Sequence, residues 1–222
     1  MTTIVSLYGD SGVWYKVIRD RVETEQRLIT AAGQVLARDG FGKLGVNAIA
    51  RQAGVDKVLI YRYFDGLPGL IKAYAEQGDF WPSAEELMAE PLAAFRQRTQ
   101  ADQLATIMSH LAAGIRKRPV TLEILSWEMV ERNELTAHLE ELREQQGLQL
   151  AALLGLDGRT EEQGSSAVDI AALVAILVGS INYLAARSRH IQHFNGVAVQ
   201  QDAGWQRLTD TMRTLCEKML SP

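Results

Sequence analysis

One segment, Ile49–Phe64, constrains the fold more tightly than any other part of this 222-residue chain. It contains a small residue, Ala50, then Gly54 four positions later, and then Ile60 six positions after the glycine. Two short helices that meet at a steep angle need a small residue at their contact, a turn residue that tolerates positive φ, and an apolar residue on the buried face of the second helix. The spacing therefore predicts a helix-turn-helix motif, in which Asp56 is the N-cap of the second helix.

The exposed face of this motif carries groups suited to nucleic acid. Lys57, Val58, Tyr61 and Arg62 would project from the first turns of the second helix, which is the end that enters the major groove in helix-turn-helix proteins. Tyrosine and arginine can donate hydrogen bonds to phosphates or base edges. We therefore expect DNA binding. An αα-hairpin with a purely structural role shares part of the pattern, so the alternative is a helical protein-interaction scaffold without DNA readout.

The distribution of charge fits binding at one end of the chain. The net charge is −4, which at first disfavours nucleic acid. Residues 16–64, however, carry nine Lys and Arg against five Asp and Glu, whereas the chain from Asp65 onward carries 14 basic and 21 acidic residues. A basic head on an acidic body confines affinity for phosphates to the head.

Helical periodicity recurs along the chain, and no convincing alternation suggests a sheet. We therefore expect an all-α fold, with a three-helix helix-turn-helix head and a helical-bundle body for ligand binding and dimerisation. The predicted domains are an N-terminal extension over 1–20, a DNA-binding domain over 21–77 and a ligand-binding and dimerisation domain over 78–222. The predicted helices cover about 25–38, 46–53, 57–64, the stretch from Gly66 to about 77, 83–98 with an interruption at Pro91, 102–116, 119–132, 135–154, 166–191 and 205–220.

Residues from Glu25 to about Gln77 resemble the DNA-binding head of the TetR (tetracycline-repressor-like) family of transcriptional regulators. The most specific part is the run Gly-Val-x-Lys-x-x-x-Tyr-x-Tyr-Phe, which begins at Gly54. The resemblance implies that Tyr61 and Tyr63 belong to the end of the recognition helix, one near the DNA backbone and the other nearer the base edges. It implies a phosphate or base contact for Lys57.

The sequence departs from the family at three places where phosphate donors commonly stand. Gly45 replaces a small hydroxyl residue, Leu59 replaces a threonine, and Gly66-Leu67-Pro68 lacks a lysine. We expect Asn47 and the basic residues between 16 and 27 to compensate. The predicted DNA-binding residues are Asn47, Lys57, Val58, Leu59, Tyr61, Arg62 and Tyr63, supported structurally by Ala50, Gly54, Asp56 and Ile60.

The body carries no family motif, so its ligand pocket is predicted from composition and resemblance. An apolar side chain at helical spacing is more often part of the core than of a pocket, and this alternative holds for each residue considered. Glu123 and Glu128 would suit a cationic ligand only if they are buried. We instead predict that both lie on a helix face exposed to solvent. The predicted pocket residues are Phe95, Met108, Leu111, Ile115, Trp127 and Tyr183, with Trp81 and Met129 as further candidates.

The apolar stretch Ala167–Ala186 is long enough to raise the question of a membrane span. It contains Asp169 and Asn182, and a single such helix is more often a core or dimer helix. Its small residues would allow another helix to approach closely, either the helix over 135–154 or the terminal helix. In the family, two such helices from each subunit form a four-helix interface; burial within one subunit is the alternative. The predicted dimer-interface residues are Ala171, Ala172, Ala175 and Gly179.

Nothing in the sequence predicts catalysis, a metal site or a cofactor. The four histidines are scattered, and no glycine-rich phosphate loop is present. The single cysteine, Cys216, allows no intrachain disulfide, and no secretory signal opens the sequence, so we expect a cytoplasmic protein. The expected function is that of a repressor that binds a palindromic operator as a homodimer and is released by an unknown small-molecule effector. Activation instead of repression stays open.

Overall fold

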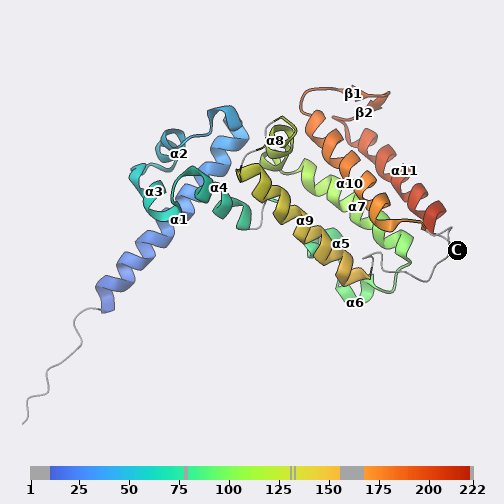
Figure 1. The fold of residues 1–222 in the computed structure, drawn as a ribbon, viewed down its shortest axis with the longest axis horizontal. Coiled ribbons are helices and arrows are strands. Elements are labelled where there is room, and N and C mark those ends of the chain that lie inside the picture. Colours follow the sequence, from blue (N-terminus) through green and yellow to red (C-terminus); the bar gives the residue numbers. More distant parts are fainter. Residues whose placement is uncertain (1–10, 78–79, 131, 133, 156–167, 221–222) are drawn as a thin grey trace, which may run out of the picture. The chain divides into compact units, whose positions relative to one another are not determined.

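The computed structural model describes residues 11–77, 80–130, 132, 134–155 and 168–220. The chain divides into two compact units, the first ending at Tyr74 and the second beginning at Ala75. The described residues form eleven α-helices, one 3-10 turn and one short hairpin (Figure 1). The all-α prediction is confirmed.

The first unit contains α1 (Ser11–Asp39), a 3-10 turn (Phe41–Lys43), α2 (Val46–Ala53), α3 (Val58–Phe64) and α4 (Leu67–Glu76), whose last two residues belong to the second unit. Its core consists of aliphatic side chains from α1, α2, α3 and α4. Eight of them are completely buried: Leu28, Ala32, Val35, Leu36, Ile49, Ile60, Leu70 and Ile71.

Helix α1 begins at Ser11, well before the predicted start at about Glu25. Residues 11–20 of the predicted N-terminal extension therefore belong to this helix, while residues 1–10 lie outside the described residues. Residues 20–23 are exposed, so this turn has no buried face and no apolar periodicity that the sequence could show. Local bonds instead stabilise it: Arg21 Nε lies 2.6 Å from Glu25 Oε1, and Thr24 Oγ1 donates to the Asp20 carbonyl at 2.6 Å.

The second unit is organised around one long central helix. It contains α5 (Ala84–Met88), α6 (Leu92–Phe95), α7 (Gln100–Arg116), α8 (Pro119–Glu128), α9 (Glu134–Leu154), α10 (Ile170–Arg187) and α11 (Asp202–Leu220). Helix α7 packs against α5, α8, α10 and α11, and most of its side chains are buried. The predicted helix over 83–98 is two short helices, with Pro91 as the N-cap of α6.

Helix α10 starts at Ile170, four residues later than predicted, because Asp169 caps it: the Asp169 carboxylate accepts a bond from the Ala172 N–H at 2.9 Å. Among the described residues, α10 is the one helix whose length and composition would allow it to cross a membrane. Only 33% of this segment is buried within the chain, so an apolar helix face is left uncovered.

A short hairpin between α10 and α11 was not predicted. Strands β1 (His193–Phe194) and β2 (Val197–Ala198) pair antiparallel, with Phe194 opposite Val197. The turn is Asn195-Gly196, both at positive φ (46° and 76°), as the tightest hairpin turns require. The Asn-Gly pair was the available signal, but strands of two residues are too short to show alternation.

Candidate nucleic-acid interface

The helix-turn-helix forms as its spacing predicts. Ala50 is only 5% exposed, and Gly54 ends α2 in the left-handed conformation with φ 65° and ψ 40°. The Val55 N–H then donates to the Ala50 carbonyl at 3.1 Å, which completes the turn. Ile60 is completely buried. These contacts fix α3 relative to α2.

Asp56 stabilises the start of α3, although one residue earlier than a regular N-cap. Helix α3 begins at Val58, and the residue immediately before it is Lys57, whose side chain makes no capping bond. The Asp56 carboxylate accepts from the Val58 N–H at 2.8 Å, and the Asp56 carbonyl accepts from the Leu59 N–H at 3.1 Å. The predicted helix start at about Lys57 therefore differs by one residue, because the first turn is tightened by this 3-10-type bond.

Helix α1 is tied to the motif by arginines. Arg27 Nη2 donates to the Ala53 carbonyl at 2.5 Å and to the Gly54 carbonyl at 3.4 Å. A cation at the end of α2 also interacts favourably with the helix dipole. The Arg21 guanidinium lies 5.1 Å from the Tyr63 ring centroid. Both arginines, which we expected to contact phosphates, thus have structural contacts within the head.

Four of the predicted DNA-binding residues form one exposed surface on α3. Val58 and Tyr61 are 60% and 56% exposed, unusual values for large apolar and aromatic side chains, and Lys57 and Arg62 are exposed beside them. We call Lys57, Val58, Tyr61 and Arg62 the α3 surface. Asn47 is also exposed, in the first turn of α2.

Leu59 and Tyr63 differ from this group because both are half-buried. The Tyr63 ring also packs edge-on against Phe64, with centroids 6.5 Å apart. Leu59 and Tyr63 thus pack within the head, and their direct contact with DNA stays a prediction.

Most of the predicted ligand-pocket residues lie in the core of the second unit. Phe95, Met108, Leu111 and Ile115 are each at most 3% exposed. Trp127 is half-buried, and Tyr183 is 41% exposed with its ring 5.8 Å from that of Phe194. Among the described residues, no cluster of three or more His, Cys, Asp and Glu side chains could hold a metal ion.

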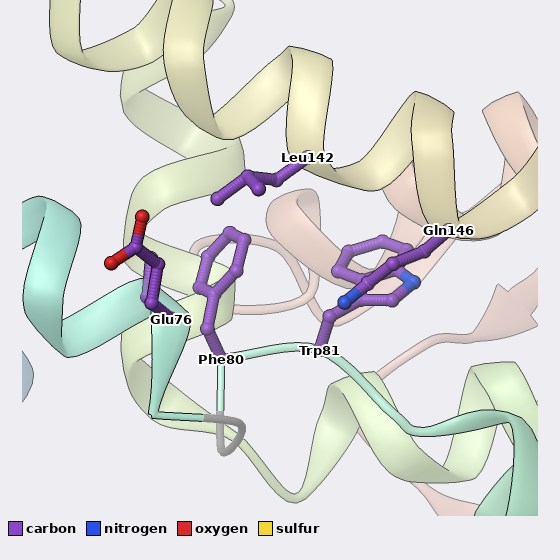
Figure 2. Close-up of a pocket in the computed structure, with 6 residues that line it drawn as sticks. Glu76, Phe80, Trp81, Leu142 and Gln146 are labelled. Carbon is purple, nitrogen blue, oxygen red and sulfur yellow. The ribbon is translucent and has the colours of Figure 1, made fainter.

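A cavity of about 200 Å³ lies elsewhere in the second unit (Figure 2). Of its lining, only Trp81 was considered from sequence. The signal that could have pointed to the cavity is the aromatic pair Phe80-Trp81, which closely follows the predicted domain boundary after residue 77. The lining residues are Ala75, Glu76, Phe80, Trp81, Leu142 and Gln146.

Glu128 does not lie on a helix face exposed to solvent, so the prediction from the sequence was wrong for this residue. Its two carboxylate oxygens accept from Arg143 Nη1 and Nη2 at 2.9 and 2.5 Å, and both side chains are about 14% exposed or less. Burial raises the pKa of Glu128 above its ordinary value, although Arg143 opposes that change. Glu123 is paired as well, with Arg189.

Comparison with known proteins agrees with this architecture. Residues 28–74 match the family described as bacterial regulatory proteins, tetR family. No curated protein sequence matches the chain. A TetR-like transcriptional regulator from Rhodococcus sp. RHA1 is 18% identical, with a TM-score of 0.56 over 90% of this chain and 97% of that one.

Two further solved structures share the fold. The fatty acid degradation regulator FadR from Bacillus halodurans is 18% identical, with a TM-score of 0.60 over 89% of this chain and 96% of that one. The transcriptional regulator FadR from Bacillus subtilis, solved in complex with stearoyl-CoA, is 17% identical, with a TM-score of 0.56 over 88% and 97%. Residues 28–74 of this chain therefore match the tetR family of bacterial regulatory proteins, and the chain as a whole has the fold of the TetR-like transcriptional regulators compared above.

Proposed function

We propose that this chain is a cytoplasmic transcriptional repressor that binds a palindromic operator as a homodimer and is released by a small molecule. The observation that carries the proposal is the α3 surface. Its exposed tyrosine, valine and two cations stand on a helix whose opposite side is anchored by the fully buried Ile60. Because α3 is anchored on one side and exposes these side chains on the other, it is suited to contacting base edges in a major groove.

The α3 surface divides into two kinds of contact. Arg62 can form two bonds to one guanine, so Arg62→Ala should weaken operator binding by about 1–3 kcal/mol, roughly 5- to 150-fold, and relax sequence preference at one position. Lys57 suits a phosphate, so Lys57→Ala should weaken binding to all sequences and lower the salt slope by about one. Tyr61→Ala should also weaken binding.

The experiment is protection mapping of the DNA upstream of the gene, followed by titrations at several salt concentrations. Lys117→Ala is the matched control, because Lys117 is an exposed cation at the end of α7, away from the proposed dimer helices. We expect it to bind as the wild type does. DNA binding by Arg62→Ala and Tyr61→Ala proteins equal to that of the wild type would contradict the reading surface. Absence of salt-dependent binding in the wild type would favour the scaffold alternative.

The homodimer is proposed from the uncovered face of α10. Ala171, Ala172, Ala175 and Gly179 are all exposed, and the same helix exposes Ile176 (69%). Small residues of this kind allow a second helix to approach closely, and large apolar side chains left in water favour association. We commit to α11 as the second interface helix, because it exposes Leu215 and Met219 and packs on α7 as α10 does. Two such subunits would place their α3 helices in successive major grooves, about 34–36 Å apart.

Two exposed glycines provide a matched test of this interface. A Cβ would meet open space at both Gly179 of α10 and Gly147 of α9. Gly179→Arg should therefore fold but lose the dimer, whereas Gly147→Arg should keep it. Sedimentation velocity measures both. If the two variants have the same mass as the wild type, the α10 interface is wrong.

Ligand release is the third part of the proposal. A ligand that favours the non-binding state by about 1–3 kcal/mol would change operator occupancy measurably. Stearoyl-CoA is the first compound to test against DNA binding, because one structural neighbour was solved with it. Phe95, Met108, Leu111 and Ile115 would line a site for a long acyl chain only after the core of α6 and α7 opens, since they are buried against it.

A further inference from the structure

Helix α10 leaves one line of side chains uncovered along most of its length. Ala172, Ile176, Gly179 and Tyr183 follow each other at spacings of four, three and four residues, which places them on one side of the helix. All four are exposed, Ile176 to 69% and Tyr183 to 41%. We call these four residues the α10 stripe. Two of them are large and two are small, so the stripe has both projections and hollows.

Tyr183 is restrained within the chain itself. Its ring lies edge-on to the ring of Phe194, with centroids 5.8 Å apart. Phe194 is half-buried on β1 and lies opposite Val197 in the hairpin. An aromatic side chain held in this way loses little freedom on association, and tyrosines are common anchors of protein interfaces. The stripe therefore ends on a side chain suited to binding another protein surface.

Opposite charges lie at the two ends of α10. Asp169 is the N-cap, three residues before Ala172, and its carboxylate accepts a bond from the Ala172 N–H at 2.9 Å. Arg187 is the last residue of the helix, four residues after Tyr183. Both are exposed, and these spacings continue the α10 stripe in each direction. The stripe is thus negative at its beginning and positive at its end.

These charges decide how two copies of α10 can meet. In parallel pairing about a two-fold axis each residue faces itself, so Asp169 meets Asp169 of the partner subunit, and Arg187 meets Arg187 of the partner subunit. Like charges then repel at both ends. Antiparallel pairing instead brings each Asp169 to Arg187 of the partner subunit. Because a two-fold interface must be self-complementary, the charges favour the antiparallel arrangement.

One antiparallel register uses the whole stripe. In it Ile176 faces Gly179 of the partner subunit, and Tyr183 faces Ala172 of the partner subunit. Each large side chain then enters the space beside a small one, and a Cβ at Gly179 would meet nothing within 4 Å in the single chain. A shift by one turn would bring Ile176 against Tyr183 in one direction and Ala172 against Gly179 in the other. The first shift overlaps two large side chains and the second leaves a void.

We propose that α10 packs antiparallel against α10 of a second copy in this register, with an ion pair between Asp169 and Arg187 of the partner subunit at each end. The inference rests on the proposed homodimer and specifies its central contact. At the crossing angle of about 20° that is usual in helix bundles, two 18-residue helices stay close over most of their length.

Disulfide cross-linking of the full chain measures the register directly. The background is Cys216→Ala, which removes the single native cysteine, and circular dichroism verifies that it folds. In this background, Ala172→Cys combined with Tyr183→Cys should give a covalent dimer on mild oxidation. Each of these two substitutions alone should give none. Two copies of the same residue would lie about 16 Å apart along the helices, whereas a disulfide spans at most about 7 Å between Cα atoms.

The possible outcomes separate the register from the homodimer. A covalent dimer from the combined variant alone supports the register. Cross-linking of either single variant would indicate parallel packing and overturn it. A chain that sediments as a dimer but forms no cross-link would overturn the register and leave the homodimer intact. A wild-type chain that sediments as a monomer would contradict the proposed function itself, and the register with it.

The ion pairs allow a second test that needs no cysteine. Each exposed pair contributes about two- to fivefold to association, and the two-fold axis repeats it. Arg187→Glu should therefore raise the Kd of the dimer by about four- to 25-fold. Lys117→Glu, at an exposed position at the end of α7, should leave the Kd unchanged.

A double-mutant cycle assigns this effect to the contact. Asp169→Asn removes the charge and keeps a side chain that can cap α10. In that background Arg187→Glu should weaken the dimer less than it does in the wild type, as sedimentation equilibrium can measure. An equal effect in both backgrounds would refute the contact between Asp169 and Arg187 of the partner subunit.

Discussion

Gly69 tests the packing of the DNA-binding head, because a side chain there has no room. A Cβ added at Gly69 in α4 would overlap the carbonyl oxygen of Phe64, the last residue of α3. A carbon stays about 3.3 Å or more from a carbonyl oxygen. The obstructing atom is backbone and cannot rotate away, so Gly69→Ala must separate α3 and α4 by more than about 1 Å.

The free-energy change follows from two opposing terms. Alanine is better than glycine in a helix by about 1 kcal/mol. Overpacking against an atom that cannot move costs about 3 kcal/mol, the upper end of its usual range. The net destabilisation of the head is therefore about 2 kcal/mol, which lowers its Tm by about 8–16 °C if it unfolds as an independent domain. Because α3 carries the proposed DNA-binding surface, operator affinity should fall as well.

Gly147 provides the control for this prediction. It lies within α9, where a Cβ meets nothing within 4 Å, so Gly147→Ala should raise the free energy of unfolding by about 0.5–1 kcal/mol. Thermal unfolding followed by circular dichroism measures both variants. If Gly69→Ala is as stable as the wild type, or gains stability as Gly147→Ala does, the close approach of α3 and α4 is refuted.

Three further substitutions test electrostatics and the turn. Bonding to Arg118 lowers the pKa of Glu86. The pair therefore stabilises the fold fully above the ordinary pKa of a glutamate, and this stabilisation is lost as pH falls through the lowered pKa. Glu86→Gln should cost at most about 1 kcal/mol at neutral pH, and urea unfolding should show no difference from the wild type in strong acid. Burial raises the pKa of Glu128 in the folded chain. The free energy of unfolding should therefore rise as pH falls from this raised pKa to the ordinary pKa of an unfolded glutamate. Glu128→Gln should remove that rise. Urea unfolding of both proteins across this pH range measures the difference. Gly54→Ala places a side chain at φ 65° and should destabilise the head by about 1–2 kcal/mol in urea; an unchanged midpoint would contradict the left-handed turn.

The helix-turn-helix was predictable because its signals are local. Gly54 ends one helix, Asp56 begins the next, and the predicted bounds of α2 match the structure. The start of α1 was not predictable in this way, since its exposed turn around Arg21 is stabilised by bonds that leave no apolar period. Likewise, the apolar stretch begins at Ala167, but the helix starts only after Asp169, because the Asp169 side chain caps α10.

The cavity and the buried ion pair could not be predicted, because both join residues far apart in sequence. Phe80 and Leu142 line the same cavity from segments about sixty residues apart. Glu128 and Arg143 lie on different helices, α8 and α9, and only their packing removes them from water. A pattern within one helix indicates which side is apolar. It does not specify which distant helix covers that side, or which charge meets which.

Helix α4 is tied to the proposed DNA-binding surface, because its first turn packs against the end of α3 so closely that only glycine fits at position 69. Its last two residues, Ala75 and Glu76, belong to the second unit, so one helix continues from the head into the body. Since a coupling of only about 1–3 kcal/mol suffices for regulation, we expect Gly69→Ala to disturb operator affinity and effector response together, and titrations of operator with and without an effector measure both.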